Sequence, residues 1–304
     1  MSEKKKYALF LGCTVPVRAL NYELSARKIA EILGIEIVDL PEFSCCGYPI
    51  SSVHHHTAIS LAARNLAIAE KAGVDIVTLC SSCTGFQVKA QKALSGPEGA
   101  EELKKVNEDL KEIGYEYKGS VKVKHIVRVL MEDVGIEKIK EAIVKPLTGI
   151  NVAAHYGCHI TKPSDIFEGF DDPIHPESLD KLIEATGATS VQYKNKHQCC
   201  GGGVLGTNED IPIKMVREKL ENVKNANADA IALVCPFCSV MYDEMQPTVD
   251  SKFDMESNIP VLYYTQLLGL ALGLDPKKDL AVKKNRVKVK PLLQKLEELQ
   301  NGSE

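Results

Sequence analysis

The chain has 304 residues, enough for about two domains and a large buried core. Its 37 basic and 41 acidic side chains give a net charge of -4, which excludes a chain-wide attraction to nucleic acid or anionic lipid. The 44% hydrophobic and 26% charged fractions exclude disordered and fibrous classes. We therefore expect a soluble globular protein whose function depends on local sites.

Taken in chain order, the first part of the chain alternates between predicted strands and helices. Buried strands are predicted for three short apolar runs, at Tyr7–Leu11, Ile35–Leu40 and Asp75–Leu79. Helical patterns lie between and after these runs, at Tyr22–Leu33, His54–Ala72 and His125–Val134. The segment Pro97–Gly114 is rich in Glu and Lys, which predicts an inserted, solvated helix.

The second part of the chain repeats this order. Strands are predicted at Val152–Tyr156, Thr189–Tyr193 and Ala230–Val234, and helices at Leu179–Ala185, Ile213–Ala226 and Tyr263–Leu272. Pro146 and Gly149 break the helical pattern between the two parts. We expect two domains, residues 1–147 and 148–304, in an α/β fold of two pseudo-repeated halves. Each half would hold a mostly parallel sheet flanked by helices.

The ten cysteines form one pattern that occurs twice. Each copy has a single cysteine, then Cys-Cys-Gly, then Cys-x-x-Cys, separated by 31 and 33 residues in the first copy and by 40 and 34 in the second. The first copy contains Cys13, Cys45, Cys46, Cys80 and Cys83, and the second contains Cys158, Cys199, Cys200, Cys235 and Cys238. Because the pattern uses every cysteine, it indicates a duplicated fold.

All these cysteine groups follow the carboxyl ends of predicted strands. In a parallel sheet those ends share one edge, where open α/β sheets bind ligands. We expect the cysteine loops of both halves to face a shared cleft.

Five thiols per half favour an iron–sulfur cluster over zinc, because a structural zinc site uses four ligands. A structural zinc module and a thioredoxin-like redox pair remain alternatives. Adjacent Cys-Cys side chains diverge, so they reach different irons of one cluster more easily than they reach one small ion.

Four sequence words carry a resemblance to a known family. They are Leu11-Gly-Cys-Thr-Val-Pro16, Cys45-Cys-Gly-Tyr-Pro49, Cys199-Cys-Gly-Gly-Gly203 and Val261-Leu-Tyr-Tyr-Thr-Gln-Leu-Leu-Gly269. With the doubled cysteine pattern, they resemble the cysteine-rich CCG domain family and, within it, the B subunits of heterodisulfide reductase from methanogenic archaea. The resemblance covers nearly the whole chain.

The resemblance implies a specific chemistry. Each group of five cysteines would bind one noncubane 4Fe-4S cluster, and the two clusters would reduce the mixed disulfide of coenzyme M and coenzyme B. Two clusters that each pass one electron would together supply the two electrons that cleave a disulfide, so we expect the sulfur–sulfur bond to be split between them. Electrons would come from a ferredoxin-like C subunit, fed by a flavin-bearing A subunit. The sequence itself has no flavin motif and no separate ferredoxin-type cysteine set. The alternatives are a CCG subunit of a lactate, glycolate or succinate oxidoreductase, and a pure electron relay.

Protons for two thiols require a donor near the cysteines. His155 and His159 flank Cys158, and we expect them to be the catalytic acids. For His197, near Cys199, a structural and a functional role are equally expected. His54–His56 are expected at the surface.

Three glycines next to the Cys-Cys pairs are predicted to bring backbone amides close to the cluster: Gly47, Gly201 and Gly203. Gly201, Gly203 and Gly206 also spell G-x-G-x-x-G, but the strand and the acidic residue of a dinucleotide site are missing from this context.

Anionic substrate groups are expected to meet Arg18 and Lys162, which follow the first cysteine of each half. A basic run from Lys277 to Lys290 is expected to be a solvated face or a docking site for an acidic partner.

Two apolar segments bear on membrane association. Ile259–Leu274 is shorter than the ~20 residues of a span and predicts a buried helix. The apolar segment after Lys4–Lys6 is shorter than the ~7–15 residues of an export signal. We expect a cytoplasmic protein, where thiols stay reduced.

Overall fold

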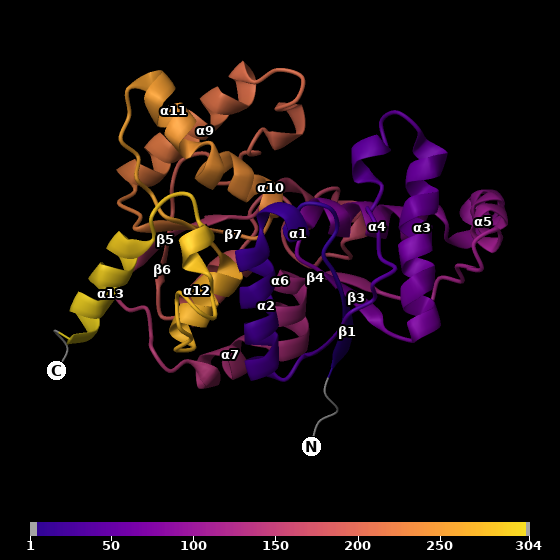
Figure 1. Cartoon of the computed structure of the whole chain (residues 1–304), viewed down its shortest axis with the longest axis horizontal. Coiled ribbons are helices and arrows are strands. Elements are labelled where there is room, and N and C mark those ends of the chain that lie inside the picture. Colours follow the sequence, from indigo (N-terminus) through magenta and orange to yellow (C-terminus); the bar gives the residue numbers. More distant parts are fainter. Residues whose placement is uncertain (1–4, 302–304) are drawn as a thin grey trace.

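The computed structural model describes residues 5–301. It contains two four-stranded parallel sheets with the strand orders β2-β1-β3-β4 and β6-β5-β7-β8. Helices cover both sheets, and the halves lie side by side (Figure 1). The expected α/β fold of two repeated halves is confirmed.

The first half builds its sheet from short apolar strands. Its strands are β1 Lys6–Phe10, β2 Glu36–Val38, β3 Asp75–Thr78 and β4 Val123–His125. Its helices are α1 Val15–Arg18, α2 Leu20–Leu33, α3 His55–Ala72, α4 Ser81–Ala93, α5 Gly96–Lys111, α6 Ile126–Arg128 and α7 Ile136–Ala142. A 3-10 turn at Tyr48–Ile50 follows the first Cys-Cys-Gly, and a π-helical turn at Val129–Val134 follows α6.

The second half repeats this arrangement. Its strands are β5 Asn151–His155, β6 Thr189–Val191, β7 Ala230–Leu233 and β8 Val261–Tyr263. Its helices are α8 Ser178–Ala185, α9 Asp210–Asn225, α10 Pro236–Ser239, α11 Gln246–Phe253, α12 Tyr264–Ala271 and α13 Lys290–Asn301. Short 3-10 turns lie at Cys158–Ile160, Ser164–Ile166, Gly202–Val204 and Val282–Lys284, and a π-helical turn lies at Val240–Glu244.

Two predictions at the sheet edges were wrong. Each half has a fourth strand, and the helices predicted to begin at His125 and Tyr263 begin one residue later, because those residues end β4 and β8. Ile259–Leu274 likewise contains β8 as well as a buried helix. Strands of three residues are too short to show an alternation of their own, so the apolar run was assigned to the helix that follows. The helix α4, after the first Cys-x-x-Cys, was also missed.

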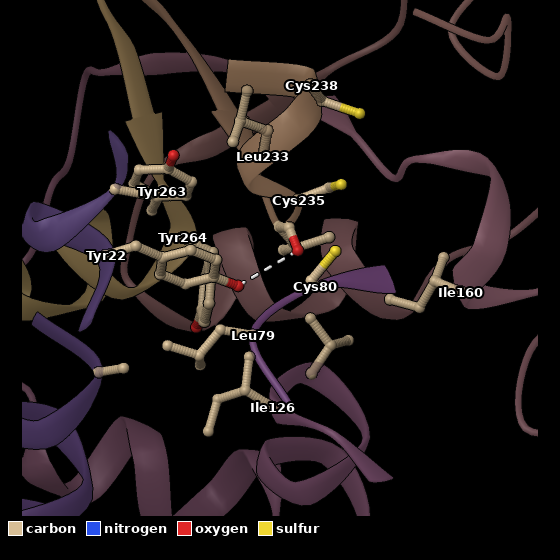
Figure 2. Close-up of a cluster of buried hydrophobic side chains, with 14 of the residues drawn as sticks. Tyr22, Leu79, Cys80, Ile126, Ile160, Leu233, Cys235, Cys238, Tyr263 and Tyr264 are labelled. Carbon is tan, nitrogen blue, oxygen red and sulfur yellow. Dashed lines mark hydrogen bonds between the residues drawn. The ribbon is translucent and has the colours of Figure 1, made fainter. Parts of the chain in front are cut away.

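One hydrophobic core continues across both halves. Helix α2 of the first half packs beside α12 of the second (Figure 1), and the hydroxyls of Ser25 and Thr265 lie 2.6 Å apart. The rings of Tyr22 and Tyr263 stack with centroids 4.0 Å apart, and the Tyr22 hydroxyl donates to the Val234 carbonyl (Figure 2). These contacts fix the backbone that precedes Cys235. No helix among residues 5–301 is long and apolar enough to cross a membrane.

Candidate metal centre

The cysteines follow the carboxyl ends of three strands in each half. The single cysteine and the Cys-x-x-Cys pair follow the two central strands, and the Cys-Cys pair follows the edge strand β2 or β6. Cys80 follows β3 and is the N-cap of α4, and Cys235 follows β7 and is the N-cap of α10. The second cysteine of each Cys-x-x-Cys lies in the first turn of its helix. A helix N-terminus favours a thiolate, but neighbouring thiols and burial raise the pKa of Cys80, Cys83 and Cys238.

Within each half the thiols lie close enough to shift one another's pKa values. In the first half, Cys46 interacts with Cys45 and Cys83, and Cys83 also interacts with Cys80. In the second half, Cys199 interacts with Cys158 and Cys200, and Cys238 interacts with Cys200 and Cys235. The first cysteine, Cys13, is exposed and lies 3.7 Å from the Thr14 hydroxyl.

The two groups also meet each other. Cys80 and Cys235 lie across the boundary between the halves, and each shifts the pKa of the other. Figure 2 shows these two sulfurs approaching from opposite halves. Burial follows the repeat: Cys13 and Cys158 are exposed, whereas Cys46, Cys200 and both Cys-x-x-Cys pairs are buried. The expected convergence of the strand-end loops of both halves is therefore present.

Hydrogen bonds between neighbouring thiols separate their pKa values. Bonds donated by two neighbouring thiols lower the pKa of Cys46 to about 4. Two such bonds also lower the pKa of Cys199 to about 2, and the pKa of Cys235 falls for the same reason. The pKa of each donating partner rises, as at Cys45 and Cys238. Neighbouring thiols therefore resist losing their protons together, and a bound cation would relieve this resistance.

Backbone amides support the sulfurs next to the Cys-Cys pairs. The Gly47 amide donates to Cys45 Sγ at 3.5 Å, and the Gly201 amide donates to Cys199 Sγ at 3.4 Å. Both glycines have a positive φ, of 90° and 79°, which favours glycine there. The Gly202 amide also donates to Cys200 Sγ, at 3.5 Å, a contact that the sequence did not single out. Gly203 lies in the same turn and is exposed.

This set of donors fits an iron–sulfur cluster in each half. Five thiols gather in each half, three of them buried, with backbone N–H groups donating to sulfur. Thiolate ligands and amide hydrogen bonds to sulfur are the usual means of holding such clusters. Within residues 5–301, no three His, Cys, Asp or Glu side chains form a ready-made site for a single ion.

A cavity of about 170 Å³ opens beside the second cysteine group. Its lining includes Cys158, Cys199, His155, His197 and Lys162. Lys162 therefore lies where it was expected, close to the cysteines. Arg18 lies at the surface, where its guanidinium pairs with Glu244 at 3.0 Å.

The two candidate acids have different surroundings. His155 is fully buried, its ring lies edge-on to Tyr242, and burial lowers its pKa to about 3. Neither of its ring nitrogens has a hydrogen-bond partner among the described residues. His159 is half-buried, and burial lowers its pKa as well. Its Nε2 lies 3.4 Å from the Tyr48 hydroxyl, which comes from the other half.

Tyr48 and Lys219 are residues near the cysteines that the sequence did not single out. The half-exposed Tyr48 lies near cysteines of both halves, and its position after Cys-Cys-Gly was a signal that could have found it. Lys219 is buried beside the second cysteine group, and its place in an amphipathic helix provided no such signal.

His54–His56 and the basic run lie at the surface. His56, held between Glu102 and Asp109, lies with His54 and His55 at the surface, as expected. The seven basic side chains between Lys277 and Lys290 are also exposed.

Comparison with known proteins decides the family. The model of the cysteine-rich CCG domain matches twice, at residues 7–86 and 152–243, once in each half. The chain belongs to the cysteine-rich CCG domain family. It is 40% identical to the B subunit of the ferredoxin/F(420)H(2)-dependent CoB-CoM heterodisulfide reductase of Methanosarcina acetivorans, over 98% of this chain and 99% of that protein. The predicted resemblance to B subunits of heterodisulfide reductase, a class of oxidoreductase subunit, is confirmed.

Two further similarities are to proteins of Wolinella succinogenes and Helicobacter pylori. The 8-methylmenaquinol:fumarate reductase membrane anchor subunit of Wolinella succinogenes is 31% identical over 93% of this chain and 97% of that protein. A crystal structure of a hypothetical protein from Helicobacter pylori superposes with a TM-score of 0.75 at 19% identity. The superposition covers 95% of this chain and 53% of the Helicobacter protein. The similarity is one of fold alone.

Proposed function

We propose that this chain is the catalytic iron–sulfur subunit of a heterodisulfide reductase. In this proposal it reduces the coenzyme M–coenzyme B disulfide to two thiols, with the sulfur–sulfur bond cleaved between two noncubane 4Fe-4S clusters. The observation that carries the proposal is the approach of Cys80 to Cys235, which links the two groups of five cysteines, with a cavity beside Cys158 and Cys199 of the second group. Similarity to heterodisulfide reductase B subunits over nearly the whole chain supports the same conclusion.

Each half would hold its cluster with its own five cysteines. The first would use Cys13, Cys45, Cys46, Cys80 and Cys83, and the second Cys158, Cys199, Cys200, Cys235 and Cys238. When bound, the clusters supply single electrons, two of which are needed to reduce one disulfide to two thiols. The amides of Gly47, Gly201 and Gly203 would stabilise the sulfurs. The first two already donate to cysteine sulfurs.

The side chains around the cavity would bind and orient the substrate. Lys162 lines the cavity and would contact a sulfonate or phosphate group of the disulfide. Arg18, on the first half, would exchange its surface pair with Glu244 for a second anionic group.

Two protons must reach the two sulfur atoms that are released. His159 would deliver one of them, because its ring lies beside Cys158 and Tyr48 where the two halves meet. His155 lines the same cavity with unpaired ring nitrogens and would transfer the other.

Electrons would arrive from other subunits, a ferredoxin-like C subunit and a flavin-bearing A subunit. The ten cysteines form two similar groups, which leaves none for a separate relay cluster. We place the protein in the cytoplasm, where thiols stay reduced and clustered cysteines bind metal.

A second candidate is a CCG subunit of another oxidoreductase, and the fumarate reductase relative favours it. The test is thiol release from the coenzyme M–coenzyme B disulfide by anaerobically purified, iron-loaded protein with a reduced dye. Two thiols per disulfide support the proposal. An iron-loaded chain that releases none contradicts it and favours the second candidate or a pure electron relay. Purified protein that contains zinc and no iron would support the structural zinc module instead.

A further inference from the structure

Equivalent helices of the two halves carry different residues at the same position. Asn65 in α3 and Lys219 in α9 each lie 19 residues after the second cysteine of their Cys-Cys pair. Both reach back to the loop that leads into that pair. Asn65 Nδ2 donates to the Cys45 carbonyl at 3.1 Å, and Lys219 Nζ donates to the carbonyls of Asn195 and Lys196. The two side chains therefore perform the same structural role, one neutral and one charged.

The Lys219 ammonium group is buried beside the second cysteine group. Its side chain is 1% exposed, and within residues 5–301 it donates its hydrogen bonds to two carbonyl oxygens rather than to a carboxylate. The ring of Tyr193 lies 5.0 Å away. Burial lowers the pKa of Lys219 to about 8, and the nearby thiols of Cys238 and Cys200 and the Glu218 carboxylate oppose this shift. The group therefore remains a cation at neutral pH, close enough to the second cysteine group to interact with its thiols.

The first half has no comparable buried cation at this position. Asn65 is neutral, and its neighbour Arg64 is only partly buried and donates to the Glu42 carbonyl and the Ser44 hydroxyl. In the second half, Lys196 is also buried, but Asp180 neutralises it at 2.5 Å. Of these cations, Lys219 is therefore the one that is fully buried without a carboxylate bound to its ammonium group.

A buried positive charge stabilises the more negative, reduced form of a neighbouring metal site and so raises its reduction potential. We infer that Lys219 makes the second half the higher-potential site of the two. This inference rests on the proposed function, in which each half holds a cluster. Its consequence is directional: an electron comes to rest in the second half, beside the cavity that Cys158 and Cys199 line. Lys219 would thus tune the reduction potential of the second metal site without contacting the substrate.

The test is a redox titration of the anaerobic, iron-loaded protein, followed by electron paramagnetic resonance without any disulfide. Signals are assigned to the halves with Cys13→Ser and Cys158→Ser. We expect two midpoint potentials, with the higher one in the second half. Lys219→Met should lower that potential and leave the first unchanged, whereas Lys219→Arg, which keeps the charge, should leave both near their original values. Lys224→Met is the matched control, because it removes an exposed lysine from the same helix.

The outcomes separate this inference from the proposed function. A higher potential in the first half, equal potentials in the unmodified protein, or no shift in Lys219→Met overturns the inference. If Lys219→Met loses iron, the titration is repeated with Lys219→Gln, which keeps a hydrogen-bond donor for the two carbonyls. The order of the two potentials in the unmodified protein tests the inference in either case. Thiol release is measured separately. A chain whose two clusters have unequal midpoint potentials but that releases no thiol would contradict the proposed function alone.

Discussion

Asp180 and Lys196 form a buried ion pair behind the cavity, and replacing Asp180 with Asn should destabilise the protein strongly. Their charged atoms lie 2.5 Å apart, and the two side chains are 12% and 5% exposed. Asp180 also accepts hydrogen bonds from the hydroxyls of Tyr156 and Ser190. Asp180→Asn leaves the Lys196 ammonium buried without its countercharge, which costs about 3–5 kcal/mol.

The assay is anaerobic urea denaturation followed by circular dichroism, which gives the free energy of unfolding. Asp210→Asn is the control, because Asp210 pairs with Lys252 at 2.6 Å with side chains 71% and 44% exposed. An exposed pair contributes little to stability, so this variant should change the free energy of unfolding little. Combining Asp180→Asn with Lys196→Met should recover part of the loss. A loss below about 1 kcal/mol for Asp180→Asn alone would refute the reasoning.

Substitutions at a surface histidine, a glycine and a cysteine test other parts of the account. The carboxylates of α5 raise the pKa of His56 above 6.5. The contribution of His56 to stability is therefore present below pH 6.5 and is lost as the pH rises through the folded-state pKa. Urea midpoints measured across this pH range should fall, and His56→Gln should flatten the fall. A methyl group at Gly47 would lie 2.4 Å from a backbone carbonyl oxygen, at a positive φ, so Gly47→Ala should cost more than ~1 kcal/mol and lower the iron content of the first half. Gly206→Ala, which meets open space, should do neither, and equal effects would contradict this account. Cys158→Ser should reduce the iron signal of the second half and spare that of the first; simultaneous loss of both would show that the halves do not bind metal independently.

The sequence predicted the duplication and the place of the cysteines because both depend on spacing. Strands that end just before a cysteine put it at the edge of a parallel sheet, and the thiols of Cys80 and Cys235 do meet there. Strands β4 and β8 were not predicted, because a strand of three residues is too short to show a hydrophobic periodicity. Their last residues, His125 and Tyr263, were therefore assigned to the helices that follow.

Side-chain environments were less predictable than positions. His155 was expected beside Cys158 as a proton donor, but no sequence pattern measures the burial that lowers its pKa to about 3. Lys219 looked like one of many lysines on an amphipathic helix, and only the packing of α9 against the loop before Cys199 buries its charge. Tyr48 crosses to the other half, a contact that depends on how the two sheets are placed.

The central claim is that each group of five cysteines holds its own iron–sulfur cluster. Anomalous diffraction at the iron edge from anaerobically grown crystals tests it most directly, because it locates and counts iron atoms in each half. We expect two separate groups of iron, one among Cys13, Cys45, Cys46, Cys80 and Cys83 and one among Cys158, Cys199, Cys200, Cys235 and Cys238. Iron in one half only, or a single zinc ion in each half, would contradict the account.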